Sequence, residues 1–303
     1  MATVIDGNAL AARLGETVHE ELEAARASGA EPGLTAVLVG SDPAAGAYER
    51  QIGRLAERLG CPYTCERMDD GAPVDDVLAT IRRLNDDPAV TGILVLRPLP
   101  SGIEEELLND ALDPDKDVEA VHPKNAGLLV QSRPRFVPST AAACFHILDE
   151  HAQSTERDPS ELFQGKTLVV VGRSISVGKP AVALGLQRNA TVVTCHSLTA
   201  KAGKLADFTR LADILIVAAG RAGLVDGDMV REGVIVIDVG MNGEKDEETG
   251  KWRFVGDVDF ESVAAKAEAI TPVPGGVGPV TDVWLIRNAV TSAVTAARPR
   301  VSS

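Results

Sequence analysis

Two glycines flank the segment that is best suited to hold a phosphate group. In KTLVVVGRSISVGKP (residues 166–180), an apolar run ends at Gly172 and a helical pattern begins at Gly178. Gly172 would let the chain turn tightly after a strand, and Gly178 would let the free N–H groups of a helix start approach a pyrophosphate. The motif is neither GxGxxG nor a P-loop, because five residues separate the glycines and Pro180 follows Lys179. A purely structural turn therefore stays open as an alternative.

The next apolar run, residues 191–194, indicates which dinucleotide this turn would bind. In NAD-binding domains an acidic residue at the end of the second strand binds the ribose hydroxyls. Here Cys195, His196 and Ser197 follow the run, and no carboxylate is present. Arg173 and Ser197 would instead bind a ribose phosphate, which favours NADP and leaves NAD as the alternative. His196 is either a polar contact to the nucleotide or, as is slightly favoured, a plain loop histidine. The predicted cofactor-binding residues are Gly172, Arg173, Ser174, Val177, Gly178, His196, Ser197 and Thr199.

The elements that must position these residues follow an alternating pattern. β-branched apolar runs predict strands, and segments with apolar residues on one face predict helices. The alternation predicts βαβ units, an α/β fold and a parallel sheet, which binds its ligands at the carboxyl ends of the strands. Arg97 follows such an end. The expected strands are residues 34–39, 90–95, 167–171, 191–194, 214–218 and 234–239, and the expected helices are residues 10–27, 44–59, 74–85 and 178–188.

Length and composition favour a globular protein with two domains. The chain has 303 residues, of which 45% are hydrophobic and 24% are charged. This balance is sufficient for a sizeable core. The polar stretch at residues 151–158 is the predicted linker before the second domain, and the Asp- and Pro-rich residues 112–123 form a predicted ordered loop.

Charge and composition argue against several other classes of protein. The net charge of −14 disfavours a nucleic-acid-binding surface, which needs clustered Lys and Arg. No run approaches the roughly 20 apolar residues of a membrane span, and the sequence MATVIDGNAL lacks a basic segment followed by an apolar one, so a cytoplasmic protein is expected. Cys61 and Cys65 are close in sequence, but no second pair of ligands completes a zinc site. No metal is predicted.

Six segments carry a resemblance to a known family. Over essentially its whole length the sequence resembles the bifunctional methylenetetrahydrofolate dehydrogenase/methenyltetrahydrofolate cyclohydrolase enzymes. The last segment is the most specific, because no simple conformational preference requires its order of Pro and Gly. The segments are VLVGSDPAAGAY (residues 37–48), GILVLRPLP (92–100), PDKDVEAVHP (114–123), VVVGRSISVGKP (169–180), TCHSLT (194–199) and ITPVPGGVGPVT (270–281).

The resemblance implies two α/β domains and a homodimer. A Rossmann-type domain at residues 146–274 would bind NADP, and residues 1–145 with 275–303 would form a smaller domain for a folate-like substrate, completed by the C-terminal helix. It further implies that Tyr48 stacks on the folate ring system, for which a core aromatic on a helix face is the structural alternative. The implied substrate-binding residues are Tyr48, Arg97, Pro98, Leu99, Glu119, Pro274, Gly275 and Gly276.

The sequence departs from the family at the positions implied to be catalytic. The family's catalytic lysine, four residues after Tyr48, is Ile52 here, and the glutamine that partners this lysine is Leu96. The aspartate that binds the pterin is Glu119, which is one methylene longer. Asp282 stands where the family usually has an apolar or small residue. The changes fall on one substrate pocket, whereas Tyr48 is retained.

The favoured function is therefore NADP-dependent oxidation of methylenetetrahydrofolate to methenyltetrahydrofolate, with cyclohydrolase activity weak or lost. Hydride transfer depends on positioning and need not use an acid or base, whereas hydrolysis needs polar assistance that Ile52 cannot give. One alternative is a dehydrogenase or reductase for a different imine or iminium substrate, in which Arg97 and Glu119 supply new contacts. The other is a noncatalytic NADP- or folate-binding protein. The substituted site positions could also have arisen by drift in a duplicated copy that has lost its function.

Overall fold

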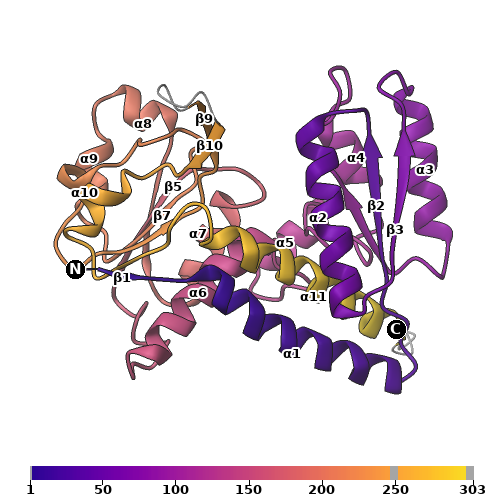
Figure 1. Cartoon of the computed structure of the whole chain (residues 1–303), viewed down its shortest axis with the longest axis horizontal. Coiled ribbons are helices and arrows are strands. Elements are labelled where there is room, and N and C mark those ends of the chain that lie inside the picture. Colours follow the sequence, from indigo (N-terminus) through magenta and orange to yellow (C-terminus); the bar gives the residue numbers. More distant parts are fainter. Residues whose placement is uncertain (1, 246–251, 298–303) are drawn as a thin grey trace. The chain divides into compact units, whose positions relative to one another are not determined.

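The computed structural model describes residues 2–245 and 252–297, which form two compact units (Figure 1). The six-stranded unit comprises residues 2–12 and 140–281, and the three-stranded unit comprises residues 13–139 and 282–297. The division falls within helices α1 (Gly7–Ala27) and α11 (Val277–Ala297). Each of these two helices therefore contributes residues to both units.

A parallel sheet forms the core of the six-stranded unit, in the order β1-β11-β8-β7-β5-β6. Its central strands are apolar and buried, as expected of a parallel sheet that helices cover. The strands are β1 (Thr3–Val4), β5 (Thr167–Val171), β6 (Thr191–Cys195), β7 (Ile214–Val217), β8 (Ile235–Asp238) and β11 (Ala269–Ile270). The other elements are α6 (Ser139–Ser154), α7 (Gly178–Gln187), α8 (Ser197–Lys201), α9 (Leu205–Thr209), the 3-10 helix Gly227–Met229, α10 (Phe260–Ala264) and the antiparallel pair β9 (Asn242–Lys245) and β10 (Trp252–Val255).

The three-stranded unit has a smaller parallel sheet in the order β3-β2-β4. Val37 and Ile93 from this sheet belong to one buried cluster with Ile81 and Leu108 from two helices. The strands are β2 (Leu34–Val39), β3 (Tyr63–Met68) and β4 (Gly92–Val95), and the helices besides parts of α1 and α11 are α2 (Pro43–Leu59), α3 (Val74–Asp86), α4 (Glu105–Ala111) and α5 (Pro123–Val130).

The predicted α/β fold with parallel sheets is confirmed, and each expected strand and helix is present with small shifts at its ends. Strand β3 was not predicted, because its centre carries Cys65, Glu66 and Arg67 in place of an apolar run. β3 pairs with β2 alone, so it lies at the edge of its sheet and tolerates these polar residues.

The two units divide the chain at other points than the sequence suggested. The expected linker at residues 151–158 begins inside helix α6, where His151 is buried at 3% exposure, so this prediction was wrong. The division lies at residues 139/140 instead of 145/146. Residues 2–12 join the six-stranded unit, because β1 pairs with β11 through Thr3 and Ala269.

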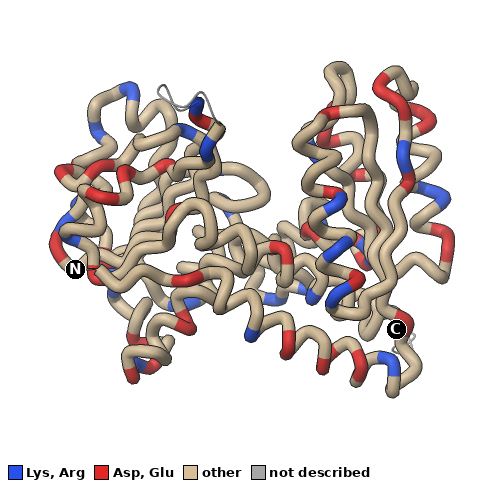
Figure 2. The backbone as a smooth tube through the Cα atoms, viewed as in Figure 1, with Lys and Arg blue, Asp and Glu red and all other residues tan. Residues whose placement is uncertain are grey.

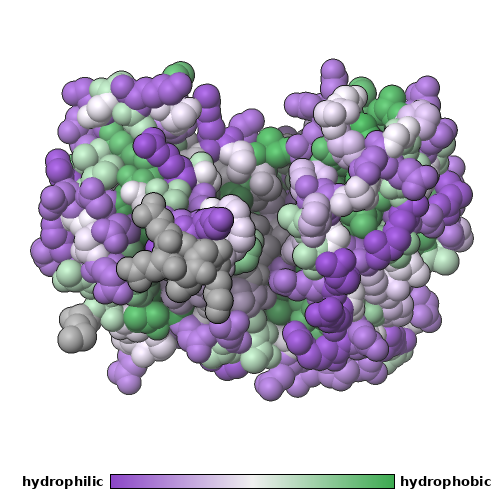
Figure 3. All heavy atoms as spheres, turned by 45° about the horizontal axis from the view of Figure 1, so that its top comes forward, coloured by the Kyte–Doolittle hydropathy of each residue, from purple (hydrophilic) through white to green (hydrophobic). Residues whose placement is uncertain are grey.

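Both signs of charge occur on both units (Figure 2), and hydrophilic side chains cover much of the face shown in Figure 3. Within residues 2–245 and 252–297, no helix is long and apolar enough to cross a membrane. Over the same residues no group of His, Cys, Asp and Glu is arranged to hold a metal ion.

Candidate functional site

Helix α2 positions Tyr48 and Ile52. It begins after Asp42, whose side chain accepts hydrogen bonds from the backbone N–H groups of Ala44 and Ala45, both at 2.9 Å. These bonds satisfy two of the N–H groups that a helix start leaves unpaired. Tyr48 and Ile52 are four residues apart, so they lie one above the other on the same face of the helix.

A carboxylate from helix α11 meets this face of α2. The Gln51 side-chain amide donates a 2.5 Å hydrogen bond to Oδ2 of Asp282, and the Tyr48 hydroxyl also donates to Asp282. Asp282 is 6% exposed, and burial raises its pKa to about 6 against the lowering effect of its two donors. Burial, together with the charges of Asp282 and Glu119, raises the pKa of Tyr48, so this hydroxyl keeps its proton.

Ile52 and Leu96 place apolar side chains at the two positions where the resemblance implied a lysine and a glutamine. Ile52 is fully buried on α2, and Leu96, just after β4, is 2% exposed. The backbone N–H of Leu96 donates to the carbonyl of Val37 at 2.9 Å, which holds this residue beside β2. Neither side chain can donate a proton or carry a charge, so neither can assist a hydrolysis.

Arg97 and Glu119 form an ion pair within the three-stranded unit. Nη1 of Arg97 donates to Oε2 of Glu119 at 2.8 Å and to the carbonyl of Val95 at 2.8 Å, and Nη2 donates to Asn109 at 2.9 Å. Nε of Arg97 donates to Glu105. Burial raises the pKa of Glu119, and Arg97 opposes this rise. Because most donors of Arg97 already have acceptors in the protein, Arg97 orients Glu119 and is poorly placed to supply an independent contact to a substrate.

The loop that carries Glu119 is fixed by the two charged residues before it. The Lys116 ammonium donates to the backbone carbonyls of Leu84, Asn85 and Asp87 at 3.0, 2.6 and 2.7 Å. The buried Asp117 carboxylate accepts from the backbone N–H of His122 at 2.8 Å. The predicted ordered loop at residues 112–123 is therefore held by buried polar contacts in place of regular structure, since no helix or strand lies between α4 and α5.

The remaining predicted substrate-binding residues divide between the two units. Pro98 is exposed and Leu99 is half-buried in the three-stranded unit, whereas Pro274, Gly275 and Gly276 belong to the six-stranded unit. Gly7, at the start of α1, packs against this second loop so closely that a Cβ would lie 1.7 Å from the Gly276 carbonyl oxygen. The sequence analysis missed Gly7, and nothing in its local pattern reveals the contact.

The glycine turn in the six-stranded unit fits a dinucleotide. A Cβ on Gly172 would lie 2.3 Å from the carbonyl oxygen of Ala218, and a Cβ on Gly178 would lie 2.3 Å from the carbonyl oxygen of Gly172. Val171 pairs with Cys195, so Arg173 and Ser197 each lie two residues beyond the paired ends of β5 and β6. Both are exposed there. This edge of the sheet thus offers a guanidinium, a hydroxyl and the start of α7 to an anion.

Four other predicted cofactor-binding residues have structural contacts at the same edge. The Ser174 hydroxyl accepts from the N–H groups of Val177 and Gly178 at 3.2 and 3.4 Å, which closes the turn. His196 accepts from the N–H of Leu198 at 3.3 Å, and Thr199 accepts from the N–H of His196 at 3.2 Å. These last two bonds cap α8, which favours the reading of His196 as a loop histidine.

Replacing Gly178 with Ala is expected to weaken binding of the dinucleotide by at least about tenfold, because the new methyl group forces the turn away from Gly172. Titration of the protein with NADP, followed by intrinsic fluorescence, measures this loss. Gly127→Ala is the matched control, since a Cβ at Gly127 on α5 meets no atom within 4 Å. Equal affinities for NADP in the Gly178→Ala and wild-type proteins would contradict the assignment of this turn.

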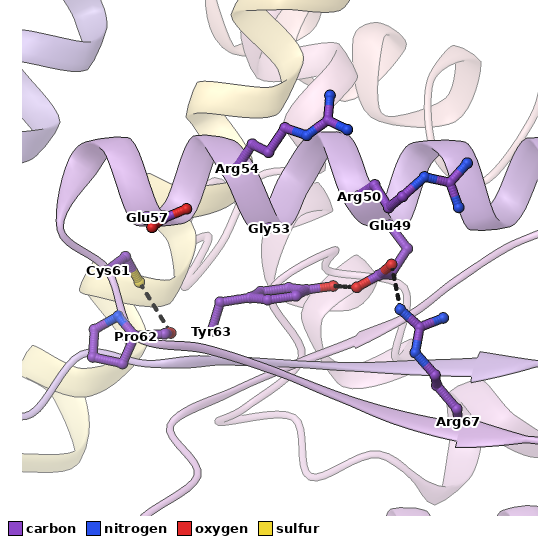
Figure 4. Close-up of a pocket in the computed structure, with 9 residues that line it drawn as sticks. All are labelled: Glu49, Arg50, Gly53, Arg54, Glu57, Cys61, Pro62, Tyr63 and Arg67. Atoms are coloured by element: carbon purple, nitrogen blue, oxygen red, sulfur yellow. Dashed lines mark hydrogen bonds and ion pairs between the residues drawn. The ribbon is translucent and has the colours of Figure 1, made fainter.

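A separate pocket of about 570 Å³ lies between α2 and β3 (Figure 4). Glu49, which is 5% exposed, accepts there from the Tyr63 hydroxyl at 3.1 Å and from Arg67 at 2.7 Å. None of the predicted site residues lines this pocket. The paired state of Glu49 gives it a structural role between α2 and β3.

Comparisons with known proteins match two domains of one family to this chain. Residues 138–297 match the NAD(P)-binding domain of the tetrahydrofolate dehydrogenase/cyclohydrolase family, and residues 5–119 match its catalytic domain. The chain is 57% identical over 290 residues to bifunctional protein FolD 3 of Rubrobacter xylanophilus, covering 95% of this chain and 91% of that protein.

Two solved structures have the same fold. One is the bifunctional enzyme FolD methylenetetrahydrofolate dehydrogenase/cyclohydrolase from Campylobacter jejuni, with a TM-score of 0.87, 38% identity and coverage of 97% of this chain and 99% of that chain. The other is the Trypanosoma brucei N5,N10-methylenetetrahydrofolate dehydrogenase-cyclohydrolase complexed with NADP cofactor and inhibitor, with a TM-score of 0.88, 33% identity and coverage of 98% and 99%. This chain therefore belongs to the tetrahydrofolate dehydrogenase/cyclohydrolase family.

Proposed function

We propose that this protein is an NADP-dependent dehydrogenase that oxidises methylenetetrahydrofolate to methenyltetrahydrofolate. The observation that carries the proposal is the glycine turn, which leaves no room for a Cβ at Gly172 or Gly178 and has exposed Arg173 and Ser197 beside it. The sequence after β6 carries no carboxylate that would select NAD. The substrate follows from membership of the family and from the dehydrogenases among its structural relatives.

In this reaction the main task of the protein is to hold the substrate carbon against the nicotinamide. The methylene carbon of the substrate gives up a hydride, which is one proton with two electrons, to the nicotinamide of NADP. The bridge between the two substrate nitrogens is left with one positive charge, and no protein group has to accept a proton. Tyr48 would stack on the ring system of the substrate, and Glu119, oriented by Arg97, would accept hydrogen bonds from the pterin amino group.

Hydrolysis of the methenyl product is the second activity of the bifunctional relatives, and in this chain we propose that it is weak or lost. Ile52 and Leu96 are both buried and apolar. Attack of water on the methenyl carbon needs a group that polarises the substrate or activates the water. The two positions that the resemblance assigns to this task supply neither.

One assay separates the candidate functions. Wild-type protein mixed with methylenetetrahydrofolate and NADP is expected to form NADPH, followed by its absorbance. Turnover of another cyclic imine in place of methylenetetrahydrofolate would favour the different-substrate alternative, for which the longer Glu119 is the supporting feature. Binding of NADP and folate without turnover of either class would contradict the proposal and favour a binding protein.

Glu119→Gln is expected to raise the KM for methylenetetrahydrofolate about tenfold, because a neutral amide accepts a weaker hydrogen bond than a carboxylate and leaves Arg97 with one anionic partner fewer. Initial rates at saturating NADP measure the effect. Glu106→Gln on α4 is the control, since Glu106 is exposed on the same unit. An unchanged KM for every pterin substrate tested would remove Glu119 from the substrate site.

The homodimer and the cytoplasmic location stay predictions. Family membership supports the first, and the composition of the sequence supports the second. Sedimentation of the purified protein at several concentrations tests the homodimer.

A further inference from the structure

Asp282 is a buried carboxylate for which the proposed function above has no use. It lies against α2 between two donors, the Tyr48 hydroxyl and the Gln51 amide at 2.5 Å. Gln51 directly precedes Ile52, and Tyr48 lies one turn before Ile52. The carboxylate therefore stands beside the position to which the family gives a lysine.

The other charges of this region do not neutralise Asp282. The negative charges of both Asp282 and Glu119 raise the pKa of the Tyr48 hydroxyl. Arg97 is paired with Glu119 and with Glu105. The single positive charge of Arg97 therefore has two carboxylate partners already and cannot also neutralise Asp282.

Two basic side chains of the neighbouring elements are already paired with carboxylates. On α11, Arg287 is paired with Glu21 of α1 at 2.9 Å. On the far side of α2, Arg67 is paired with Glu49 near Tyr63. At neutral pH the group around Tyr48 therefore has an excess of negative charge in the part of the chain that the structure describes.

We propose that Asp282 is the counter-charge for the positive charge that hydride removal leaves on the substrate. This role rests on the proposed dehydrogenase function and makes Asp282 a residue that favours methenyltetrahydrofolate, whose one-carbon bridge is cationic, over folates without that positive charge. A pocket with a lysine at position 52 would repel that cation. This chain has an uncharged isoleucine there and a carboxylate beside it, so the sign of the local charge is reversed.

The physical basis is the growth of charge during the reaction. The substrate is neutral at its methylene bridge and the product is cationic, so a fixed carboxylate stabilises the product and the transition state that leads to it more than the substrate. Because Asp282 is buried, its interaction with the cation is screened less than that of an exposed pair. Two hydrogen bonds already hold the carboxylate in place, so little reorganisation accompanies the reaction.

The test compares two ligands that differ in this charge. Isothermal titration of wild-type protein and of Asp282→Asn with methenyltetrahydrofolate and with tetrahydrofolate, without NADP, gives the ratio of the two affinities. Asn keeps the size of the side chain and can still accept from Tyr48, but it has no charge. Asp282→Asn is expected to lower the affinity for methenyltetrahydrofolate about tenfold, to leave that for tetrahydrofolate within about twofold, and to lower kcat more than it raises KM. Asp76→Asn, which removes an exposed carboxylate from α3, is the matched control.

A second readout uses the wild-type protein alone and does not depend on the folding of the variant. Asp282 takes up a proton near its pKa of about 6, so its charge is present above this pH and is lost below it. The ratio of the affinity for methenyltetrahydrofolate to that for tetrahydrofolate is therefore expected to fall at least about threefold between about pH 7 and about pH 5. The pKa of Glu119 is also raised by burial, so the same pH series with Glu119→Gln separates its contribution from that of Asp282.

The outcomes distinguish the proposed dehydrogenase activity from the counter-charge role of Asp282. If wild-type protein binds neither folate and forms no NADPH, both are wrong. If the wild-type protein forms NADPH but Asp282→Asn retains its kcat and its preference for methenyltetrahydrofolate, the dehydrogenase stands and the counter-charge role is wrong. An equal loss of affinity for both folates would assign Asp282 only to the positioning of Tyr48 and would also overturn the proposal.

Discussion

Replacing Arg173 with Ala raises the KM for NADP at least about tenfold and leaves the KM for NAD within about twofold. Arg173 is exposed two residues beyond the end of β5, level with Ser197 beyond the end of β6, where a ribose phosphate would lie. A charge-assisted hydrogen bond to phosphate contributes about 1.5–3 kcal/mol, which corresponds to roughly a tenfold effect or more. Initial rates with methylenetetrahydrofolate and each dinucleotide measure both constants.

The control for Arg173 is Arg82→Ala, which removes an exposed guanidinium from α3 in the other unit. Its KM values for both dinucleotides should match those of the wild type. A wild-type protein with equal KM values for NAD and NADP, or an Arg173→Ala variant that loses both equally, would contradict the assignment of Arg173 to the ribose phosphate.

The wild-type protein is expected to hydrolyse methenyltetrahydrofolate far more slowly than it forms it, and the paired change Ile52→Lys with Leu96→Gln should restore more hydrolysis than the two single changes together. Ile52 is fully buried, so a lone lysine there is a buried charge whose available partner is Asp282 and not the glutamine that the family pairs with it. A lone glutamine at the buried position 96 leaves an unpaired amide, at about 1–3 kcal/mol. Introduced together, the two side chains can bind each other, so their effects are not additive.

Decay of methenyltetrahydrofolate absorbance measures hydrolysis for all four members of this cycle. Asp282 accepts a hydrogen bond from Gln51, the residue before position 52, and we expect it to compete with the glutamine for the new ammonium. The same cycle in an Asp282→Val background should therefore show a larger gain. Thermal unfolding of each variant checks that the buried substitutions leave the protein folded. Rapid hydrolysis by the wild-type protein, comparable in rate to its dehydrogenase reaction, would contradict the prediction.

Local sequence patterns predicted the elements of the fold but not its division into units. Strands β5 and β7 are apolar runs between helical segments, and this pattern depends only on neighbouring residues. The pairing of Thr3 with Ala269 joins residues from the two ends of the chain, and no local pattern encodes it. Helix α6 was not predicted, and the predicted linker overlaps its last four residues, because the sequence alone does not show that the polar His151 is buried.

Local sequence patterns also do not predict the contacts between residues of the candidate site. The motifs identified Tyr48, Arg97 and Glu119 as candidate site residues, but their order in the sequence does not reveal that Arg97 holds Glu119. Gln51 and Asp282 are 231 residues apart, and their contact follows only from the packing of α11 on α2. The single hint was that Asp282 departs from the family pattern, which marked the position without assigning it a partner.

The pairing of β1 with β11 has a consequence for the order in which the protein can be made. The edge of the six-stranded sheet is complete only when residues 269–270 have been made, long after β1. The three-stranded unit needs α11, whose Asn288 donates to the carbonyls of Val118 and Val137 at 2.8 and 2.9 Å. Neither unit is a continuous stretch of chain, so neither can finish folding while the nascent protein is still short. One face of β2 and β4 packs on residues 77–121, but Gly92 of β4 lies against Ala289 of α11, so this unit is complete only after α11 has been made.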